Sequence, residues 1–157
     1  KNYELLYKGS KTGSYLTIEK KNGSVVPVAV WEVTADDEKR LDAYEGYPNF
    51  YYKKNMKITL AETGKIINAF VYIMHEERKL GIPSYAYVRT CVQGYRDFGF
   101  DLKHLRLAFD ISERGVRIDS QTLICPDCGT REALESIVVS KEEQEKIVSI
   151  IHRSITE

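Results

Sequence analysis

A glutamate at the end of a predicted helix, Glu45, is the first residue whose type and position could do chemistry. Gly46 follows it, as glycine commonly follows the last residue of a helix, and an aromatic strand begins near Tyr51. The helix macrodipole disfavours negative charge there and neighbouring tyrosines reduce hydration, so we expect a raised pKa for Glu45. Such a carboxylate can exchange a proton near neutral pH, as a general acid or base must. The alternative is that Glu45 is one of 23 acidic residues and lies solvated at a helix end.

The pair Cys125 and Cys128, in the order Cys-Pro-Asp-Cys-Gly, is the second chemical pattern. It has the form of a zinc knuckle, but a structural zinc site needs four ligands. The third cysteine, Cys91, is expected on the buried face of a helix, and none of the three histidines has ligand spacing to the pair. A four-ligand site, a site shared across a dimer and a metal-free turn remain open. The sequence favours the metal-free turn, so we expect no metal ion at this pair.

Basic residues could also form a pocket for an anionic ligand. The candidates are Arg78, Lys79, Arg96, Arg106, Arg114 and Arg117. The alternative is that these scattered side chains lie solvated on the surface, where basic residues are usually found. Because 23 basic residues balance 23 acidic ones, the formal charge is zero, which argues against nucleic acid or an anionic membrane as the partner. We expect a small-molecule ligand instead.

The chain of 157 residues is 43% hydrophobic and 29% charged, as is typical of one globular protein. No apolar run approaches the roughly 20 residues that span a bilayer, and the first residues lack the pattern of a signal peptide. Three unevenly spaced cysteines do not make a disulfide framework. We therefore expect a cytoplasmic protein that does not act on membranes.

Alternating apolar and polar residues predict a series of short strands in the first half of the chain. The expected strands cover residues 3–7, 15–18, 25–33, 51–60 and 65–74. Asn22-Gly23 predicts a hairpin turn before the third of them. Together they predict a meander of antiparallel strands.

Helices are expected between and after these strands. The first begins at Thr34, where Asp37 completes a capping box, and it places Leu41 and Tyr44 on an apolar stripe. The next two begin at Ser84 and Asp101, with Gly99 between them. Their inward positions are Val88, Cys91, Val92 and Tyr95 in one helix, and Leu102, Leu105, Ala108 and Phe109 in the other. Strands first and helices later indicate an α+β fold, with a closed or nearly closed antiparallel sheet.

The sequence changes in character after Phe109, so we divide the chain into a domain at residues 1–109 and an appendage at residues 110–157. The appendage is expected to contain a hairpin-like stretch, the cysteine turn and a last helix that begins at Ser140. The apolar residues of this helix are Ile147, Ile150, Ile151 and Ile155. They either pack on the preceding domain, which we favour, or form a contact in a homodimer.

Several of these motifs, in this order, resemble the gamma-glutamylcyclotransferase-like family. The resemblance rests on Leu-Asp-x-x-Glu-Gly at residues 41–46, the strand at 28–33, the aromatic strand from Tyr51, Pro-Ser-x-x-Tyr at 83–87 and Gly-Tyr-Arg-Asp-Phe-Gly at 94–99. It covers residues 2–109. The resemblance implies a small β-barrel with flanking helices, which agrees with the α+β prediction.

The resemblance also implies an activity and a site. Enzymes of this family cleave γ-glutamyl amides through attack by the substrate's own α-amine, and they release 5-oxoproline and a free amine without a cofactor. Glu45 matches the family's catalytic glutamate and would act as the general acid/base. Tyr87 matches the tyrosine after Pro-Ser, and Tyr51 or Tyr52 matches the aromatic residue past the glutamate. Their hydroxyls would orient the carboxylates of the glutamyl group.

One departure from the family pattern concerns a Tyr-Gly-Ser-Asn-like loop, whose backbone N–H groups hold the γ-glutamyl group and the developing oxyanion. The expected place of this loop lies upstream of Asn2, and residues 7–11 correspond instead to the exit turn of the second strand. Two interpretations follow. Either the chain is a truncated or processed form of an enzyme, or it is a catalytically inactive barrel that binds a small anionic metabolite or nucleotide-like signal.

Overall fold

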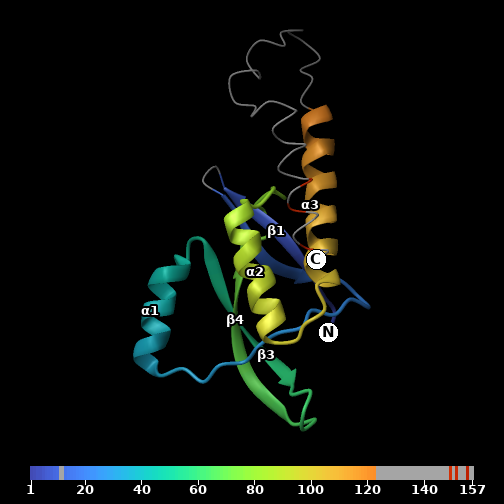
Figure 1. Ribbon diagram of the computed structural model, residues 1–157. Helices are drawn as coiled ribbons and strands as arrows, with labels where there is room; N and C mark the ends of the chain where they lie inside the picture. Colours follow the sequence, from blue (N-terminus) through green and yellow to red (C-terminus); the bar gives the residue numbers. More distant parts are fainter. Residues whose placement is uncertain (11–12, 123–148, 150, 152–154, 156–157) are drawn as a thin grey trace.

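The computed structural model of the protein describes residues 1–10, 13–122, 149, 151 and 155. The architecture is mixed α+β (Figure 1). In chain order its elements are β1 (Tyr3–Ser10), β2 (Gly13–Lys20), α1 (Ala35–Glu45), β3 (Tyr51–Thr59), β4 (Ile66–Met74), α2 (Tyr85–Asp97) and α3 (Lys103–Thr122).

The described strands form two separate antiparallel sheets, β1–β2 and β3–β4, so the predicted closed barrel is not found in this part of the chain. The two sheets approach each other where the Met74 N–H donates to Thr17 Oγ1 at 2.9 Å. This bond joins a backbone to a side chain, and no backbone ladder connects β2 with β4. A barrel requires such a ladder around its whole circumference.

The strand predicted at residues 25–33 is also not formed. The turn before it is present, with Gly23 at a φ of 81° and its N–H bonded to Asn2 Oδ1 at 3.2 Å. Among the described strands none pairs with residues 25–33, and a single extended segment has no ladder to hold it. Val25 and Trp31 are 54% and 72% exposed as a result.

The helix boundaries agree with the sequence because they depend on local capping. Thr34 and Asp37 form the capping box of α1, and Gly46 ends that helix at a φ of 63°. Ser84 caps α2 by accepting the N–H of Tyr87. The apolar stripe predicted for α1 is wrong, because no residue of α1 is buried and Tyr44 is 86% exposed.

Helix α3 continues through residues 110–122, so the hairpin-like stretch expected after Phe109 is wrong there. Ser112, one turn beyond the predicted end of the inward stripe, is fully buried against β1. Its hydroxyl accepts the Tyr7 N–H at 3.1 Å and donates to the Tyr7 carbonyl at 3.0 Å. The division of the chain at residues 109 and 110 stays a prediction, and its boundary falls within α3.

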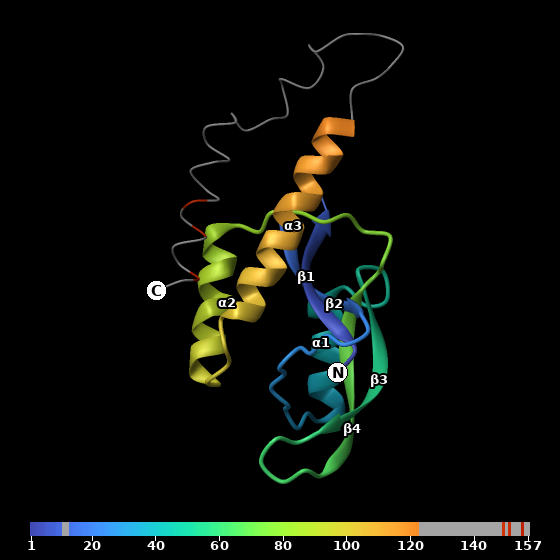
Figure 2. The same ribbon diagram turned by 90° about the vertical axis from the view of Figure 1, so that its right-hand side faces the viewer.

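The core lies between β1, α2 and α3, and these two helices lie side by side in Figure 1 and Figure 2. Its buried members are Tyr7, Val88, Val92, Leu105, Ala108, Phe109, Ile151 and Ile155. The inward positions predicted for α2 and α3 therefore face this core. Ile151 and Ile155 are 0% and 2% exposed, which confirms the packing interpretation for these two residues. In the described part of the chain, no helix is both long and apolar enough to cross a bilayer.

Candidate active site

Glu45 is the last residue of α1 and is half-buried. The left-handed Gly46 turns the chain directly after it, and the Tyr47 N–H closes the turn on the Asp42 carbonyl at 2.9 Å. Burial raises the pKa of the Glu45 carboxyl above its ordinary value. The direction of this shift is the one that a general acid/base requires.

Tyr51, the first residue of β3, lies within electrostatic reach of Glu45. The residue is 8% exposed, and its hydroxyl donates to the Leu16 carbonyl at 3.4 Å. Burial raises the pKa of Tyr51, and the nearby Glu45 carboxylate raises it further. Tyr51 is therefore a neutral hydroxyl at physiological pH, within the electrostatic reach of the candidate base.

Tyr87 of α2 contacts the backbone of the same residue, Leu16. Its hydroxyl accepts the Leu16 N–H at 3.1 Å, while Tyr51 bonds the carbonyl of that residue. Burial also raises the pKa of Tyr87. The thiol of Cys91 lies one turn further along α2, and burial raises its pKa to about 11, so it is not a thiolate nucleophile.

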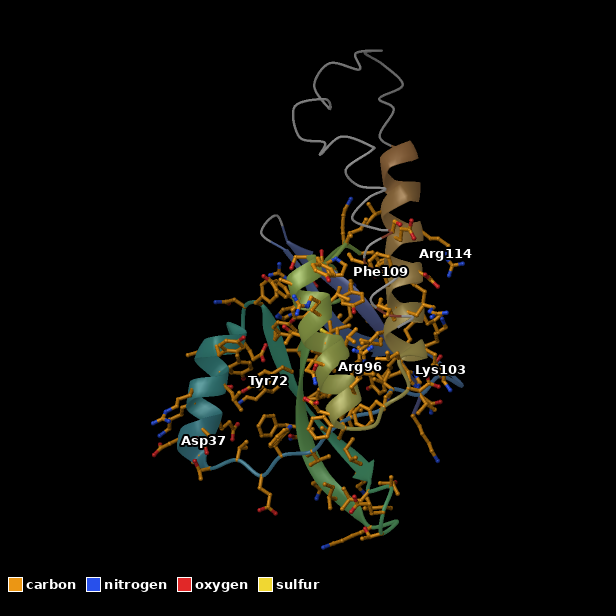
Figure 3. The ribbon with its side chains drawn as sticks, viewed as in Figure 1. Asp37, Tyr72, Arg96, Lys103, Phe109 and Arg114 are labelled. Carbon is orange, nitrogen blue, oxygen red and sulfur yellow. The ribbon has the colours of Figure 1, made fainter. Side chains whose placement is uncertain are left out.

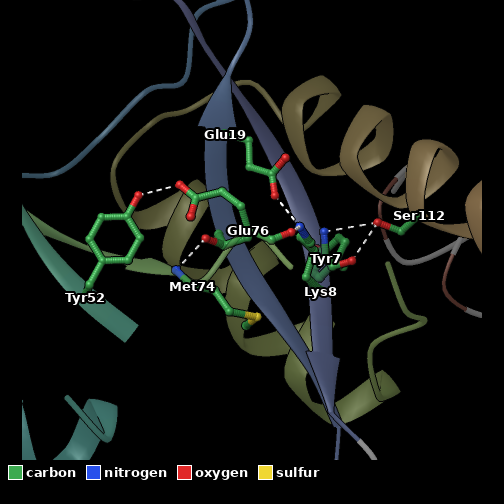
Figure 4. A network of polar contacts seen from close by, with 8 residues as sticks. Tyr7, Lys8, Glu19, Tyr52, Met74, Glu76 and Ser112 are labelled. Carbon is green, nitrogen blue, oxygen red and sulfur yellow. Dashed lines mark hydrogen bonds and ion pairs between the residues drawn. The ribbon is translucent and has the colours of Figure 1, made fainter. Parts of the chain in front are cut away.

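Tyr52 lies away from this site, because successive strand residues point to opposite faces. Its hydroxyl donates to Glu76 Oε1 at 2.5 Å (Figure 4). The Lys8 ammonium donates to the Glu76 carbonyl at 2.7 Å and pairs with Glu19. Burial and the Glu76 bond raise the pKa of Tyr52 to about 12. Of the two tyrosines that the sequence offered past the glutamate, Tyr51 is the one beside Glu45.

Three further side chains, Tyr15, Phe50 and Arg78, surround the site and were not singled out together from the sequence. The Tyr15 ring packs edge-on against Tyr87 and Phe50, with ring centroids 5.2 and 6.4 Å away. The Arg78 guanidinium lies 4.1 Å from the centroid of the Phe50 ring. The sequence held one signal for Phe50, namely that it directly precedes Tyr51. Tyr15 lies on β2 and Arg78 on the segment after β4, so only the fold brings them to this site.

Polar contacts hold α1, and with it Glu45, against the β3–β4 hairpin. Tyr72 points from β4 toward α1 (Figure 3), and its hydroxyl donates to Asp42 Oδ1 at 2.5 Å. Lys53 of β3 pairs with Asp42 at 3.0 Å and with Glu38 at 2.5 Å. Because α1 buries no residue, these contacts rather than apolar packing set its position.

The basic residues predicted to share a pocket do not gather at one place. Arg96 lies on α2 and Arg114 on α3 (Figure 3), while Arg78 lies beside Phe50. Arg96 contributes with Arg89 to a surface hollow of about 800 Å³ along α2, and neither Glu45 nor any of the three predicted tyrosines lines it. The side chain of Arg117 lies outside the described residues. Lys79 and Arg106 are exposed, as the alternative of surface side chains predicts.

Cys125 and Cys128 lie outside the described residues, as does the start of the predicted last helix at Ser140. The zinc-knuckle prediction therefore gains no support from the structure. Within the part that is described, no three His, Cys, Asp or Glu side chains are grouped as metal ligands would be.

Comparison with known proteins identifies the family of the chain. A search of curated proteins gives no match, and a search of solved structures gives none. The family model described as gamma-glutamyl cyclotransferase, AIG2-like, matches residues 1–89, which include Glu45, Tyr51 and Tyr87. Since this match covers more than half of the 157 residues, the chain belongs to the AIG2-like gamma-glutamyl cyclotransferase family.

Proposed function

We propose that the protein cleaves γ-glutamyl amides to 5-oxoproline and a free amine, with Glu45 as the general acid/base. The observation that carries this proposal is a half-buried carboxyl with a raised pKa, at a helix end and beside the neutral hydroxyl of Tyr51. The family of the chain supplies the reaction class. No cofactor enters the scheme, because both the nucleophile and the electrophile belong to the substrate.

In this scheme Glu45 takes one proton from the α-ammonium of the substrate. The amine nitrogen attacks the γ-carbonyl carbon, a C–N bond closes the five-membered ring, and the carbonyl electron pair moves to oxygen. Collapse of this oxyanion breaks the bond to the leaving nitrogen, to which Glu45 returns the proton. The ring nitrogen then gives its second proton to the Glu45 carboxylate, which passes it to the departing amine, and the amine leaves as an ammonium ion. The reaction consumes no water and needs no oxidant.

Tyr51 and Tyr87 are proposed to bind the substrate. Each hydroxyl contacts the backbone of Leu16, one at its carbonyl and the other at its N–H. Their raised pKa values keep both hydroxyls protonated. To donate to a carboxylate or to the developing oxyanion, the Tyr51 hydroxyl would exchange its 3.4 Å bond to the Leu16 carbonyl for one to the substrate. Tyr52 is left out of this role because it points to the opposite face of β3, where Glu76 accepts its proton at 2.5 Å.

A second candidate is binding of a small anionic metabolite without turnover. The observation that favours it is the Arg78 guanidinium, which lies next to Tyr51 and has a buried N–H without an acceptor in the described part of the chain. Both candidate functions require a small ligand with an anionic group, and only the first converts this ligand into a product. Formation of product therefore distinguishes the two candidate functions.

The test is 5-oxoproline release from a panel of γ-glutamyl amides, measured by mass spectrometry. Glu45→Gln preserves the size of the side chain and removes its basicity, so we expect a loss of about 10²–10⁴ in rate. Glu62→Gln, at an exposed glutamate in the turn between β3 and β4, is the matched control and should react at the wild-type rate. A Glu45→Gln variant that keeps a near wild-type rate would contradict the proposal. Binding of γ-glutamyl compounds without any release by the wild type would favour the second candidate.

A further inference from the structure

Arg78 follows β4 by four residues and is anchored over the aromatic part of the site. Its guanidinium carbon lies 4.1 Å from the centroid of the Phe50 ring, and its Nη2 donates to the Asn49 carbonyl at 3.4 Å. These contacts hold the guanidinium over the ring, since a cation is attracted to the face of an aromatic ring. These contacts leave most of the five N–H donors of the group for other partners.

One of those donors is buried without a partner. Arg78 Nε has no hydrogen-bond acceptor among the residues that the structure describes. A buried N–H without an acceptor is unfavourable, and in native proteins such a group calls for an explanation, of which an acceptor supplied by a ligand is one. Arg78 also forms no ion pair with any described carboxylate, whereas Lys8 and Lys53 each do.

Arg78 is connected to the proposed base, Glu45, through the aromatic residues that follow α1. The Arg78 guanidinium lies over the Phe50 ring, and the Phe50 N–H donates at 2.8 Å to the carbonyl of Gly46, the residue after Glu45. Arg78 and Glu45 also lie within electrostatic reach of the same Tyr51 hydroxyl. The glutamyl part of the proposed substrate carries the same two charges on one carbon, an α-ammonium and an α-carboxylate. If the Glu45 carboxylate receives the α-ammonium of the substrate, then the Arg78 guanidinium is the complementary positive group for the α-carboxylate.

We infer that Arg78 binds the α-carboxylate of the glutamyl substrate, and so selects compounds that carry this group. The inference rests on the proposed function and adds to it a residue that determines specificity. A planar guanidinium binds a carboxylate through two parallel N–H···O bonds, which lysine is unable to reproduce. Holding the carboxylate at Arg78 places the adjacent ammonium toward Glu45, where its proton is removed.

The experiment compares two γ-glutamyl anilides that differ only at the α-carbon, one with a carboxylate and one with a primary carboxamide. Arg78→Met keeps an apolar stem over Phe50 and removes every N–H donor, and Arg78→Lys keeps the charge alone. For the carboxylate substrate we expect KM to rise by about 10–100-fold in Arg78→Met, the effect of losing a charge-assisted pair of hydrogen bonds. For the carboxamide we expect a change of less than about twofold, because its recognition does not use the lost donors.

Arg89→Met is the matched control. Arg89 also lies over an aromatic ring, 5.9 Å from the centroid of Tyr85, but on the outer side of α2. This variant should keep the wild-type KM for both substrates. If Arg78→Met instead raises KM equally for both substrates and lowers the melting temperature, Arg78 only supports the fold and the inference is overturned.

A binding measurement keeps this test independent of turnover. The product 5-oxoproline retains the α-carboxylate, and its carboxamide lacks it, so both are titrated against wild type and Arg78→Met. If the wild type releases no product but binds 5-oxoproline in an Arg78-dependent way, the proposed reaction fails and the inference stands. If product is released and the substitution changes neither KM nor 5-oxoproline binding, the inference fails and the reaction stands.

Discussion

The Tyr72 hydroxyl of β4 donates a hydrogen bond of 2.5 Å to Asp42 Oδ1, three residues before Glu45 on α1. This bond lowers the pKa of Asp42, and the Lys53 ammonium lowers it further. The helix that carries the candidate base buries none of its residues, so its position depends on such contacts. The site is thus assembled on a helix that polar side chains hold in place.

Tyr72→Phe should therefore lower both activity and stability at neutral pH. A carboxyl whose pKa is lowered by folding stabilises the native state above its unfolded pKa, and this stabilisation is lost as the pH falls through its folded pKa. The melting-temperature difference between wild type and Tyr72→Phe should be largest near pH 7 and vanish in acid, in a series of thermal melts. Tyr52→Phe removes a bond of the same length to Glu76, away from α1, and should leave kcat unchanged. An equal loss of kcat in both variants would contradict the role of Tyr72 in positioning.

Glu45→Gln should raise the melting temperature at neutral pH while it removes activity. Burial raises the pKa of Glu45, so folding favours its protonated form. The stabilising contribution is complete below the unfolded pKa and is lost as the pH rises through the folded pKa, which leaves a penalty at pH 7. The gain of the variant over wild type should shrink as the pH falls below about 4, near the ordinary pKa of glutamate. A variant less stable than wild type at pH 7 would mean that a partner stabilises the ionised carboxylate.

Tyr7→Phe should stabilise the protein by about 1 kcal/mol, because a buried hydroxyl without a partner costs free energy that phenylalanine does not incur. The Tyr7 ring is fully buried against Tyr87 and Phe109, and its hydroxyl has no partner among the described residues. Tyr87→Phe is the control, since it removes the acceptor of the Leu16 N–H and should destabilise. Chemical denaturation of both variants gives the comparison. A loss of stability in Tyr7→Phe would show that its hydroxyl is satisfied.

Ser112→Ala should destabilise the protein by about 2 kcal/mol, since it leaves a backbone N–H buried and unpaired. The Tyr7 carbonyl keeps a bond to the Gly81 N–H at 3.1 Å, but the Tyr7 N–H has Ser112 as its acceptor. Ser84→Ala removes an exposed helix cap and should cost about 1 kcal/mol. Urea denaturation should rank Ser112→Ala as the more damaging substitution. The reverse order would mean that α3 and β1 are not joined through this hydroxyl.

The sequence by itself determined those features that depend on neighbouring residues. The capping box of Thr34 and Asp37, the left-handed Gly46 and the alternation along β3 and β4 involve contacts within a few positions, so residue types predict them. This local information placed Glu45 at a helix end beside an aromatic strand. The family match covers the same part of the chain.

Only the tertiary structure decided how distant segments meet. Tyr15, Phe50, Arg78 and Tyr87 come from separate parts of the chain, and no local pattern states that their side chains share one site. The exposure of Tyr44 and the lack of a partner for residues 25–33 among the described strands have the same origin, since both depend on which surface or strand lies opposite. Whether a residue is buried or paired depends on the segment that packs against it as much as on its own type, and the tertiary fold determines which segment that is.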